Sequence, residues 1–364
     1  MKICSWCGVV VVLVISGCGG ADPGEPTVTA SAGPTPESVA KPPDAVPKPR
    51  VSRRKKPVRL DMMMIKALFG NYPTVSGDVV NQATPAQVAL GRTLYQSEHL
   101  SKNGDVSCAS CHDLANYGQD GKRAASRADG TRGSRNTPTT WNAFRHFAQL
   151  WDYRAANVEE QAMMALLDST QHGLVDEADL VAKISARPEL VAAFKEAFPG
   201  DQPLTGAHVG LAIGAFQRTL VTRSPWDDFI EGDGKALSND EKLGFKKFMD
   251  VGCGSCHMSR LLGGNMPQKI GVFSPYPDQT DTGRYRQSGN DSEKFFFKVP
   301  SLLNVEKTAP YNHDGAVATL EESVRQMAKI QLAKDLTDEE VGSIVAFLKA
   351  LTGKLPADIM ANGR

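Results

Sequence analysis

Two short motifs in this chain combine residue types that could hold a cofactor covalently. Each has a cysteine, two intervening residues, a second cysteine and a histidine, at residues 108–112 and again at residues 253–257. Two thiols at this spacing can add to the two vinyl groups on one edge of a porphyrin, and the adjacent histidine can then bind the iron. The motifs therefore predict two covalently bound c-type haems. The predicted haem-binding residues are Cys108, Cys111, His112, Cys253, Cys256 and His257.

Two other kinds of site also use paired cysteines. A zinc site could draw on both pairs, but it gives no reason for a histidine directly after each second cysteine. A thioredoxin-like redox site is expected in a βαβ setting, and we find no such pattern around either motif. Haem attachment is therefore the leading interpretation.

The first residues are typical of an export signal. After the basic Lys2, residues 9–15 form an unbroken apolar run, which is shorter than the about 20 residues that a membrane-spanning helix needs. The residues that follow resemble a bacterial lipoprotein cleavage site. We therefore expect a lipoprotein signal peptide over residues 1–17, a lipid on Cys18, and a location on the periplasmic side of a bacterial membrane. An ordinary secretory peptide with an incidental cysteine is the alternative.

Composition separates a linker from the rest of the chain. Residues 18–59 are rich in Pro, Ala, Gly, Ser and Thr, so we expect a disordered tether that cannot build a core. Lys+Arg and Asp+Glu both total 41, and this balance gives no reason to expect a nucleic-acid partner. Of the seven cysteines, two precede the cleavage site, one takes the lipid, and four lie in the two motifs. No structural disulfide is therefore expected.

A helix is predicted just before each cysteine motif. Thr84 followed by Pro85 is a favoured helix start, and the second helix follows a capping box that begins at Ser238. Each helix has a glycine four residues before an aromatic side chain, so the two share one face. These glycines, Gly91 and Gly244, would let a second helix approach closely.

The partner helices are predicted further along the chain. One is expected over residues 208–223, and the other follows a capping box at Thr337 and ends near Gly353. Strand-like alternation is scarce. The predicted fold class is therefore mainly α, with two cytochrome c-like domains rich in long ordered loops. The first domain is expected over residues 60–235 and the second over residues 236–364.

The second axial ligand is easier to find in one unit than in the other. In a cytochrome c unit this ligand lies in the loop before the closing helix, and in the second unit Met327 lies in that region. A haem with methionine and histidine ligands is expected to have a raised potential, which suits electron transfer. Methionine is as often a core filler as a ligand, so position alone leaves both roles open.

No comparable ligand stands out in the first unit. An iron without a tight sixth ligand can bind a small oxidant, so the first haem is the candidate catalytic one. Met163 and Met164 lie in an apolar stretch and are expected to be core residues. The candidates for a sixth ligand are Met163, Met164, His146, His172 and Tyr153.

From near residue 66 to its end, the chain resembles the bacterial dihaem cytochrome c peroxidases, a family that includes the MauG-type enzymes, which oxidise protein side chains. The most specific stretches are residues 297–305 and 308–315, and residues 135–139 and 149–155 also match. The resemblance implies that Met327 binds the second iron, as a methionine does in these peroxidases. The MauG-type enzymes use a tyrosine there.

The resemblance also implies two features between the domains. It places Trp151 between the two haems, where an indole can relay electrons. It places Asn136, Thr308 and Pro310 at an interdomain calcium ion, which an amide oxygen, backbone carbonyls and waters could ligate. The alternatives are a buried tryptophan and ordinary turn residues.

Two departures from the family pattern concern the first haem. The family peroxidases carry a histidine in the segment that corresponds to residues 127–130, and this chain has none there. The first haem is therefore expected to be permanently open. The distal glutamate of the family falls on Gln171, whose amide cannot titrate. Our hypothesis is that the neighbouring His172 moves the proton instead; a surface histidine or a one-residue misalignment is the alternative.

These expectations lead to one reaction and two rivals. The leading hypothesis is a peroxidase that reduces hydrogen peroxide to water at the first haem, with electrons from a small cytochrome c or copper protein entering at the second. The rivals are a MauG-like oxidase of a partner protein and a dihaem electron carrier that is not an enzyme. The resemblance also allows a homodimer.

Overall fold

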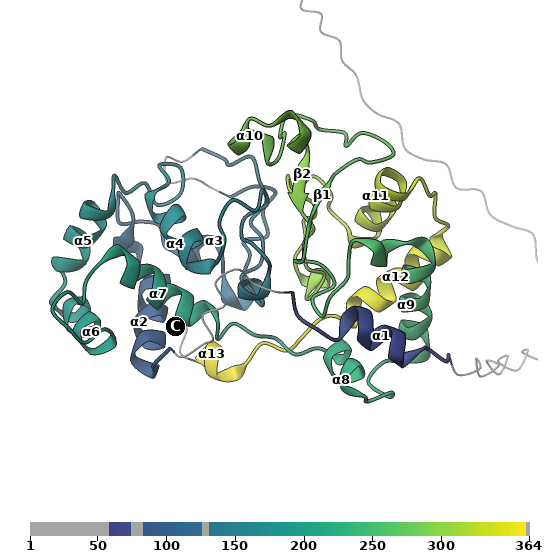
Figure 1. Ribbon diagram of the computed structural model, residues 1–364, viewed down its shortest axis with the longest axis horizontal. Coiled ribbons are helices and arrows are strands. Elements are labelled where there is room, and N and C mark those ends of the chain that lie inside the picture. Colours follow the sequence, from purple (N-terminus) through teal and green to yellow (C-terminus); the bar gives the residue numbers. More distant parts are fainter. Residues whose placement is uncertain (1–57, 74–82, 126–130, 362–364) are drawn as a thin grey trace, which may run out of the picture. The chain divides into compact units, whose positions relative to one another are not determined.

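The computed structural model describes residues 58–73, 83–125 and 131–361 (Figure 1). The expected signal peptide, Cys18 and nearly all of the expected tether lie outside these residues. So does the segment 127–130, in which the family histidine is missing. None of the helices in the described ranges combines the length and the apolar character that crossing a membrane requires.

The fold is mainly α, as predicted, and the strands of the described residues form one small two-stranded sheet. The helices of the first unit, which surrounds residues 108–112, are α2 (Pro85–Gln96), α3 (Cys108–Cys111), α4 (Val158–Leu167), α5 (Glu177–Ser185), α6 (Pro188–Ala197) and α7 (Gly206–Gln217). The second unit, which surrounds residues 253–257, has α9 (Asn239–Val251), α10 (Tyr285–Ser288), α11 (Leu320–Leu332) and α12 (Asp338–Lys349). The remaining helices are α1 (Met62–Phe69), α8 (Pro225–Glu231) and α13 (Ala357–Ala361), and β1 (Pro267–Lys269) pairs antiparallel with β2 (Phe296–Lys298).

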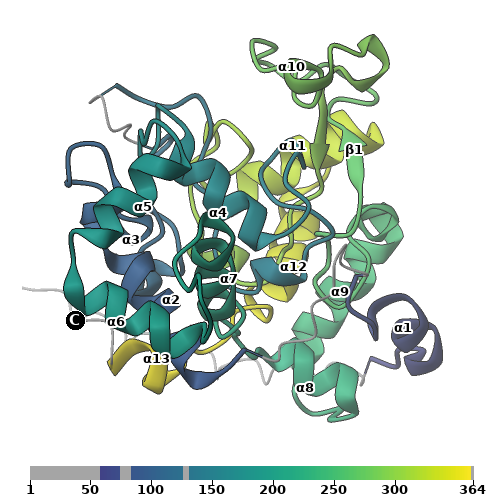
Figure 2. The ribbon, with the colours of Figure 1, turned by 60° about the vertical axis from the view of Figure 1, so that its left-hand side comes forward.

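The predicted helix starts and helix pairs are confirmed. Thr84, Ser238 and Thr337 each cap their helix with a side-chain oxygen in a complete capping box. Helix α2 lies against α7 and α9 lies against α12 (Figures 1 and 2). A β-carbon on Gly91 would lie 1.8 Å from the carbonyl oxygen of Ala212, and one on Gly244 would lie 2.1 Å from that of Ser343. Only glycine allows these backbones to meet.

Two predicted helix ends are wrong. Helix α7 ends at Gln217 rather than at residue 223, because the chain turns there and Thr222 bonds to the Asn142 and Asn304 side chains. Helix α12 is capped by Ala350, so Gly353 is not its cap. A β-carbon on Gly353 would meet the Thr222 side chain at 2.6 Å, so this glycine serves close packing between the units.

The hydrophobic cores do not follow the expected boundary at residue 235. Ile65 and Phe69 of α1 and Trp226 of α8 precede it, yet they pack in the core of α9 and α12. Conversely, Ile359 of α13 packs with Tyr95 and other side chains of the first unit. Each unit is therefore completed by a helix from the opposite end of the chain.

The glycine contact between α9 and α12 gives a prediction about stability. Gly244→Ala should lower the free energy of unfolding by about 1–3 kcal/mol, because the added methyl group must push the two backbones apart. Gly342→Ala is the matched control: Gly342 lies exposed on α12 with nothing within 4 Å of an added β-carbon. This control should be neutral or stabilising by up to about 1 kcal/mol. Denaturant unfolding of the two variants measures both effects. Equal unfolding midpoints for Gly244→Ala and Gly342→Ala would contradict the close contact between α9 and α12.

Candidate functional site

The first cysteine motif is held in a short capped helix. Ser107 caps α3 in a box with Ser110, which fixes the backbone that carries Cys108 and Cys111. His112 follows at the end of this helix, and its Nδ1 donates a hydrogen bond to the carbonyl oxygen of Gly118 at 3.1 Å. Its proton is therefore on Nδ1, which leaves the lone pair of Nε2 for a metal.

The second motif fixes its histidine in the same way, although its short 3-10 helix (Cys253–Ser255) has no side-chain cap. Cys253 lies directly after α9, and His257 donates from Nδ1 to the carbonyl oxygen of Leu262 at 2.9 Å. Burial lowers the pKa of both His112 and His257, so both imidazoles are neutral near pH 7. Neutral imidazoles with a carbonyl behind them are the usual arrangement of a metal-binding histidine.

None of the four cysteines in the two motifs forms a disulfide. Burial raises the pKa of Cys108 to about 12 and that of Cys253 to about 11, so both are protonated thiols near pH 7. In the described ranges, no three His, Cys, Asp or Glu side chains form a cluster that could hold a metal ion. The donor set in each motif, two thiols and one neutral imidazole, therefore fits a covalently attached haem.

Met327 lies inside a helix rather than in the loop expected from the sequence. It is half-buried on α11, which begins at a capping box on Thr319. By contrast, Met249 packs against the core of α9 and α12. Since α11 directly precedes α12 in the chain, Met327 remains on the element next to the closing helix.

Trp151 lies where segments of the two units meet. Its Nε1 donates to the carbonyl oxygen of Asn136 at 2.9 Å, and its own carbonyl accepts from the backbone N–H of Lys298 at 2.8 Å. Its ring lies edge-on to the ring of His313, with centroids 6.5 Å apart. The indole is thus half-buried and fixed by both units.

The predicted calcium residues come from two loops that touch. The backbone N–H of Asn136 donates to the carbonyl oxygen of His313 at 2.8 Å, so Asn136 lies beside the loop that carries Thr308 and Pro310. The side-chain nitrogen of Asn136 donates to the carbonyl oxygen of Lys122 at 2.9 Å. Its amide oxygen is the atom that remains for a cation.

Gln171 and His172 follow α4, close to the first motif. Gln171 donates from Nε2 to the carboxylate of Asp168 at 3.1 Å. His172 is only 4% exposed, so it is not a surface residue. Its Nδ1 donates to the carbonyl oxygen of Leu100 at 2.8 Å, and its Nε2 lies 3.9 Å from the sulfur of Cys108. Burial lowers the pKa of His172, so its imidazole is neutral near pH 7. The Nε2 lone pair faces the Cys108 sulfur, at the attachment site of the first haem.

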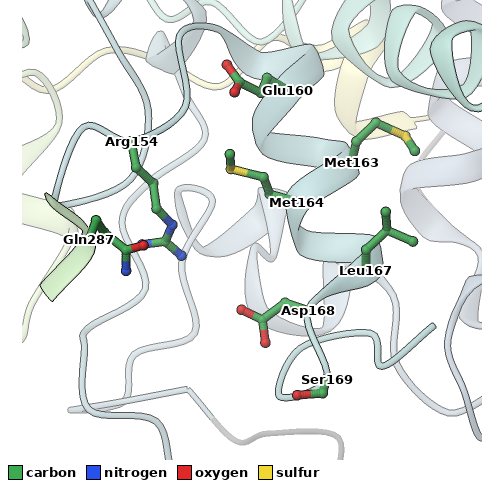
Figure 3. Close-up of a pocket in the computed structure, with 8 residues that line it drawn as sticks. All are labelled: Arg154, Glu160, Met163, Met164, Leu167, Asp168, Ser169 and Gln287. Carbon is green, nitrogen blue, oxygen red and sulfur yellow. The ribbon is translucent and has the colours of Figure 1, made fainter. Parts of the chain in front are cut away.

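A pocket of about 580 Å³ opens beside α4 (Figure 3). Met163 and Met164 line this pocket, and both are half-buried. The prediction that both are core residues is therefore wrong for Met164. It is partly right for Met163, which also contacts the core. Asp168, the partner of Gln171, lies on the same wall. The lining residues are Arg154, Glu160, Met163, Met164, Leu167, Asp168, Ser169 and Gln287.

One buried pair between the units was not predicted from the sequence. Lys298 and His146 are 7% and 6% exposed, and the Lys298 ammonium lies 3.2 Å from Nδ1 of His146. This contact turns the His146 ring toward Gly264 of the second unit. A lysine among apolar neighbours in residues 295–299 was the available signal.

This fold and its paired-cysteine sites define a cytochrome c-type protein with two haem-binding units. Residues 85–235 match the sequence model of the family described as di-haem cytochrome c peroxidase. The chain is 40% identical over 292 residues to the cytochrome c551 peroxidase of Nitrosomonas europaea, with 79% of this chain and 86% of that protein covered. It is 37% identical over 299 residues to the cytochrome c551 peroxidase of Pseudomonas aeruginosa, with 80% and 86% covered. A crystal structure of a MauG-like protein associated with microbial copper homeostasis has a TM-score of 0.68 at 27% identity, with 78% of this chain and 93% of that chain covered.

The chain therefore belongs to the dihaem cytochrome c peroxidase family, in the broad sense that includes the MauG-type proteins. It is a haem peroxidase, and its family carries two haems. These findings confirm the predicted family, enzyme class and haem content.

Proposed function

We propose that this enzyme reduces hydrogen peroxide to water with electrons from a small cytochrome c or a copper protein. The observation that carries the proposal is the matched pair of motifs, in which a carbonyl fixes each histidine with Nε2 available to iron. When bound, the haems supply one-electron chemistry and a site at which peroxide is cleaved. Cys108, Cys111 and His112 would hold the peroxidatic haem. Cys253, Cys256, His257 and Met327 would hold the electron-transfer haem.

Trp151 is proposed to relay electrons between the two units. Its hydrogen bond to Asn136 and its backbone bond from Lys298 hold the indole in one orientation. Asn136, Thr308 and Pro310 are proposed to bind one calcium ion, which would tie the same two loops together. The ion would thereby keep the relay in place.

Proton movement at the first haem is proposed to use His172. Cleavage of the peroxide bond needs a group that moves a proton between the two oxygens, and the amide of Gln171 can only donate a hydrogen bond. His172 is neutral, has an unprotonated Nε2 and lies beside Cys108. Gln171 would orient the peroxide while Asp168 fixes the Gln171 side chain.

The His172 proposal predicts a specific kinetic loss. His172→Ala should lower peroxide turnover by about 100-fold, because a general acid–base group is removed. His172→Gln, which keeps a polar side chain of similar size, should not restore it. Stopped-flow peroxide reduction measures both variants, with haem absorbance as the check that both cofactors remain attached. A wild-type rate in His172→Ala would exclude this role.

The location and assembly are proposed from the sequence and the family. The chain would be exported, acylated on Cys18 and held on the periplasmic side of a membrane, where a homodimer can form. Replacing Cys18 by serine should release the protein from the membrane fraction without changing its haem content.

The test of the proposed function is a steady-state assay of purified holoprotein with hydrogen peroxide and reduced cytochrome c. Rapid donor oxidation that depends on peroxide supports the peroxidase. Exchange of electrons with the donor but no peroxide turnover would contradict the proposed substrate.

A further inference from the structure

Helix α1 is apolar on the side that faces solvent as well as on the side that faces the core. Ile65 and Phe69 are buried in the core of the second unit. Met63, Met64 and Leu68 lie on the other side of the helix and are 81%, 45% and 38% exposed. Met64 and Leu68 are four positions apart and Met63 is adjacent, so the three side chains form one exposed apolar face.

This face gathers side chains that are scattered elsewhere. Ten large hydrophobic side chains are exposed in the described parts of the chain, and four of them lie between residues 63 and 72. Isolated apolar side chains on a surface need no explanation, whereas a contiguous group marks an interaction surface. The other six are Leu167, Val175, Leu211, Leu243, Val272 and Phe273.

Helix α1 is fixed on the outside of the second unit, beside α8 (Figures 1 and 2). The carboxylate of Asp61 caps its first turn. At its other end, the carbonyl oxygens of Leu68 and Asn71 accept from the backbone N–H groups of Ser259 and Arg260, at 3.1 and 2.8 Å. These bonds tie the helix to the segment that directly follows the second cysteine motif.

Positive charge precedes this helix in the sequence. Seven of the twelve residues 48–59 are Lys or Arg, and none is acidic. The last of them, Arg59, is exposed and lies two positions before the residue that caps α1. The acids Asp228 and Glu231 of α8 are already paired with Arg223. An apolar helix face next to a basic run matches the two parts of an anionic lipid surface, its acyl chains and its headgroups.

The length of chain before α1 gives a second reason to expect a lipid surface. The proposed acylation site is at Cys18, and the proline-rich residues 18–59 could extend to about 130 Å. A lipid at the far end of such a tether would hold the enzyme near a membrane without orienting it. A second contact, placed where the tether ends, would supply the orientation.

We propose that the apolar face of α1 and the basic run 48–59 dock the enzyme onto anionic phospholipid. Met63, Met64 and Leu68 would reach below the headgroups, and the helix would lie in the interface rather than cross it. Docking in this way would turn the side of the second unit that carries α1 toward the membrane. The inference extends the proposed location and does not depend on the proposed reaction.

The test is flotation of purified holoprotein with lipid vesicles, using Cys18→Ser so that no attached lipid contributes. Phosphatidylcholine vesicles with about 30% phosphatidylglycerol should bind the protein, with half-saturation at about 0.1–1 mM lipid, close to the range of one myristoyl chain. Pure phosphatidylcholine, or a salt concentration of about 0.5 M, should weaken binding by at least about tenfold. Haem absorbance in the floated fraction measures the bound protein. Binding this weak is lost when membranes are washed, so Cys18→Ser should still leave the membrane fraction.

Two variants separate the two parts of the surface. The double variant Met63→Gln and Met64→Gln should weaken binding to the phosphatidylglycerol vesicles by about tenfold, because it removes apolar area that leaves water on docking. Replacing the four basic residues 53–56 by glutamine should abolish the preference for phosphatidylglycerol. Both changes are outside the cores, and an unchanged unfolding temperature checks that the fold is intact.

The matched control is an equally exposed apolar side chain of the first unit. Val175 is 82% exposed in a loop, so Val175→Gln should bind vesicles as the parent does. Equal binding by the parent and the double methionine variant, or equal binding to the two lipid compositions, would overturn the proposal. A raised KM for the donor protein in the methionine variant, with vesicle binding unchanged, would overturn it as well by assigning the face to a protein partner. Flotation needs neither peroxide nor a donor, so its result stands apart from that of the peroxidase assay.

Discussion

Replacing His112 by alanine should abolish peroxide reduction while the second unit still accepts electrons from a donor. The haem would remain attached through Cys108 and Cys111, but its iron would lose the imidazole whose Nδ1 is fixed by Gly118. Loss of a group that only supports a metal ligand lowers metal affinity or activity by about 10–100-fold. Removal of the ligand itself should therefore lower kcat by more than about 100-fold. Steady-state donor oxidation by peroxide measures the loss.

A second histidine of the first unit provides the control. His208 also donates from Nδ1 to a backbone carbonyl, that of Pro203 at 2.8 Å, but it follows no cysteine pair. His208→Ala should therefore retain near wild-type turnover. If His112→Ala turned over peroxide as fast as His208→Ala, the first motif would not hold the catalytic haem.

Replacing Met327 by alanine should open the second iron to external ligands. The reduced wild type is expected to bind about one carbon monoxide molecule per chain, at the first haem, because Met327 fills the sixth position of the second. Met327→Ala should bind about two, and its second haem should lose the raised potential that methionine ligation gives. Optical titration with carbon monoxide counts the sites directly.

Met249 is the matched control for this change. It is half-buried against the core of the second unit, so Met249→Ala should lower stability by about 0.5–3 kcal/mol and leave the carbon monoxide count unchanged. If Met327→Ala still bound one molecule per chain, another residue would be the sixth ligand.

Local sequence signals predicted the parts of this fold that local chemistry decides. The capping residues Thr84, Ser238 and Thr337 satisfy backbone N–H groups within one turn, so their effect can be read from neighbouring residues. Gly91 and Gly244 were informative because each lies four residues before an aromatic side chain on one face of its predicted helix.

Contacts between distant segments were not predictable in this way. The packing of α1 and α8 on the second core depends on where the chain returns in space, and no local pattern encodes it. Lys298 and His146 are 152 positions apart, so neither sequence neighbourhood reveals their contact. The burial of His172 likewise depends on Leu100 and Cys108, which precede it by more than one element.

The Cys-x-x-Cys-His signature located the haem motifs, but neither it nor the family pattern decided the chemistry of the first pocket. Gln171 occupies the position where the resemblance implies a glutamate, and the structure shows its amide held by Asp168. That contact explains how the side chain is oriented. His172 is the proposed source of the proton, and stopped-flow peroxide reduction by His172→Ala tests this role.

The most direct measurement is a pyridine haemochrome titration of the purified, denatured protein. Covalent attachment at both cysteine motifs predicts two haems per polypeptide that stay with the chain through acid–acetone extraction. One retained haem, or none, would contradict the account.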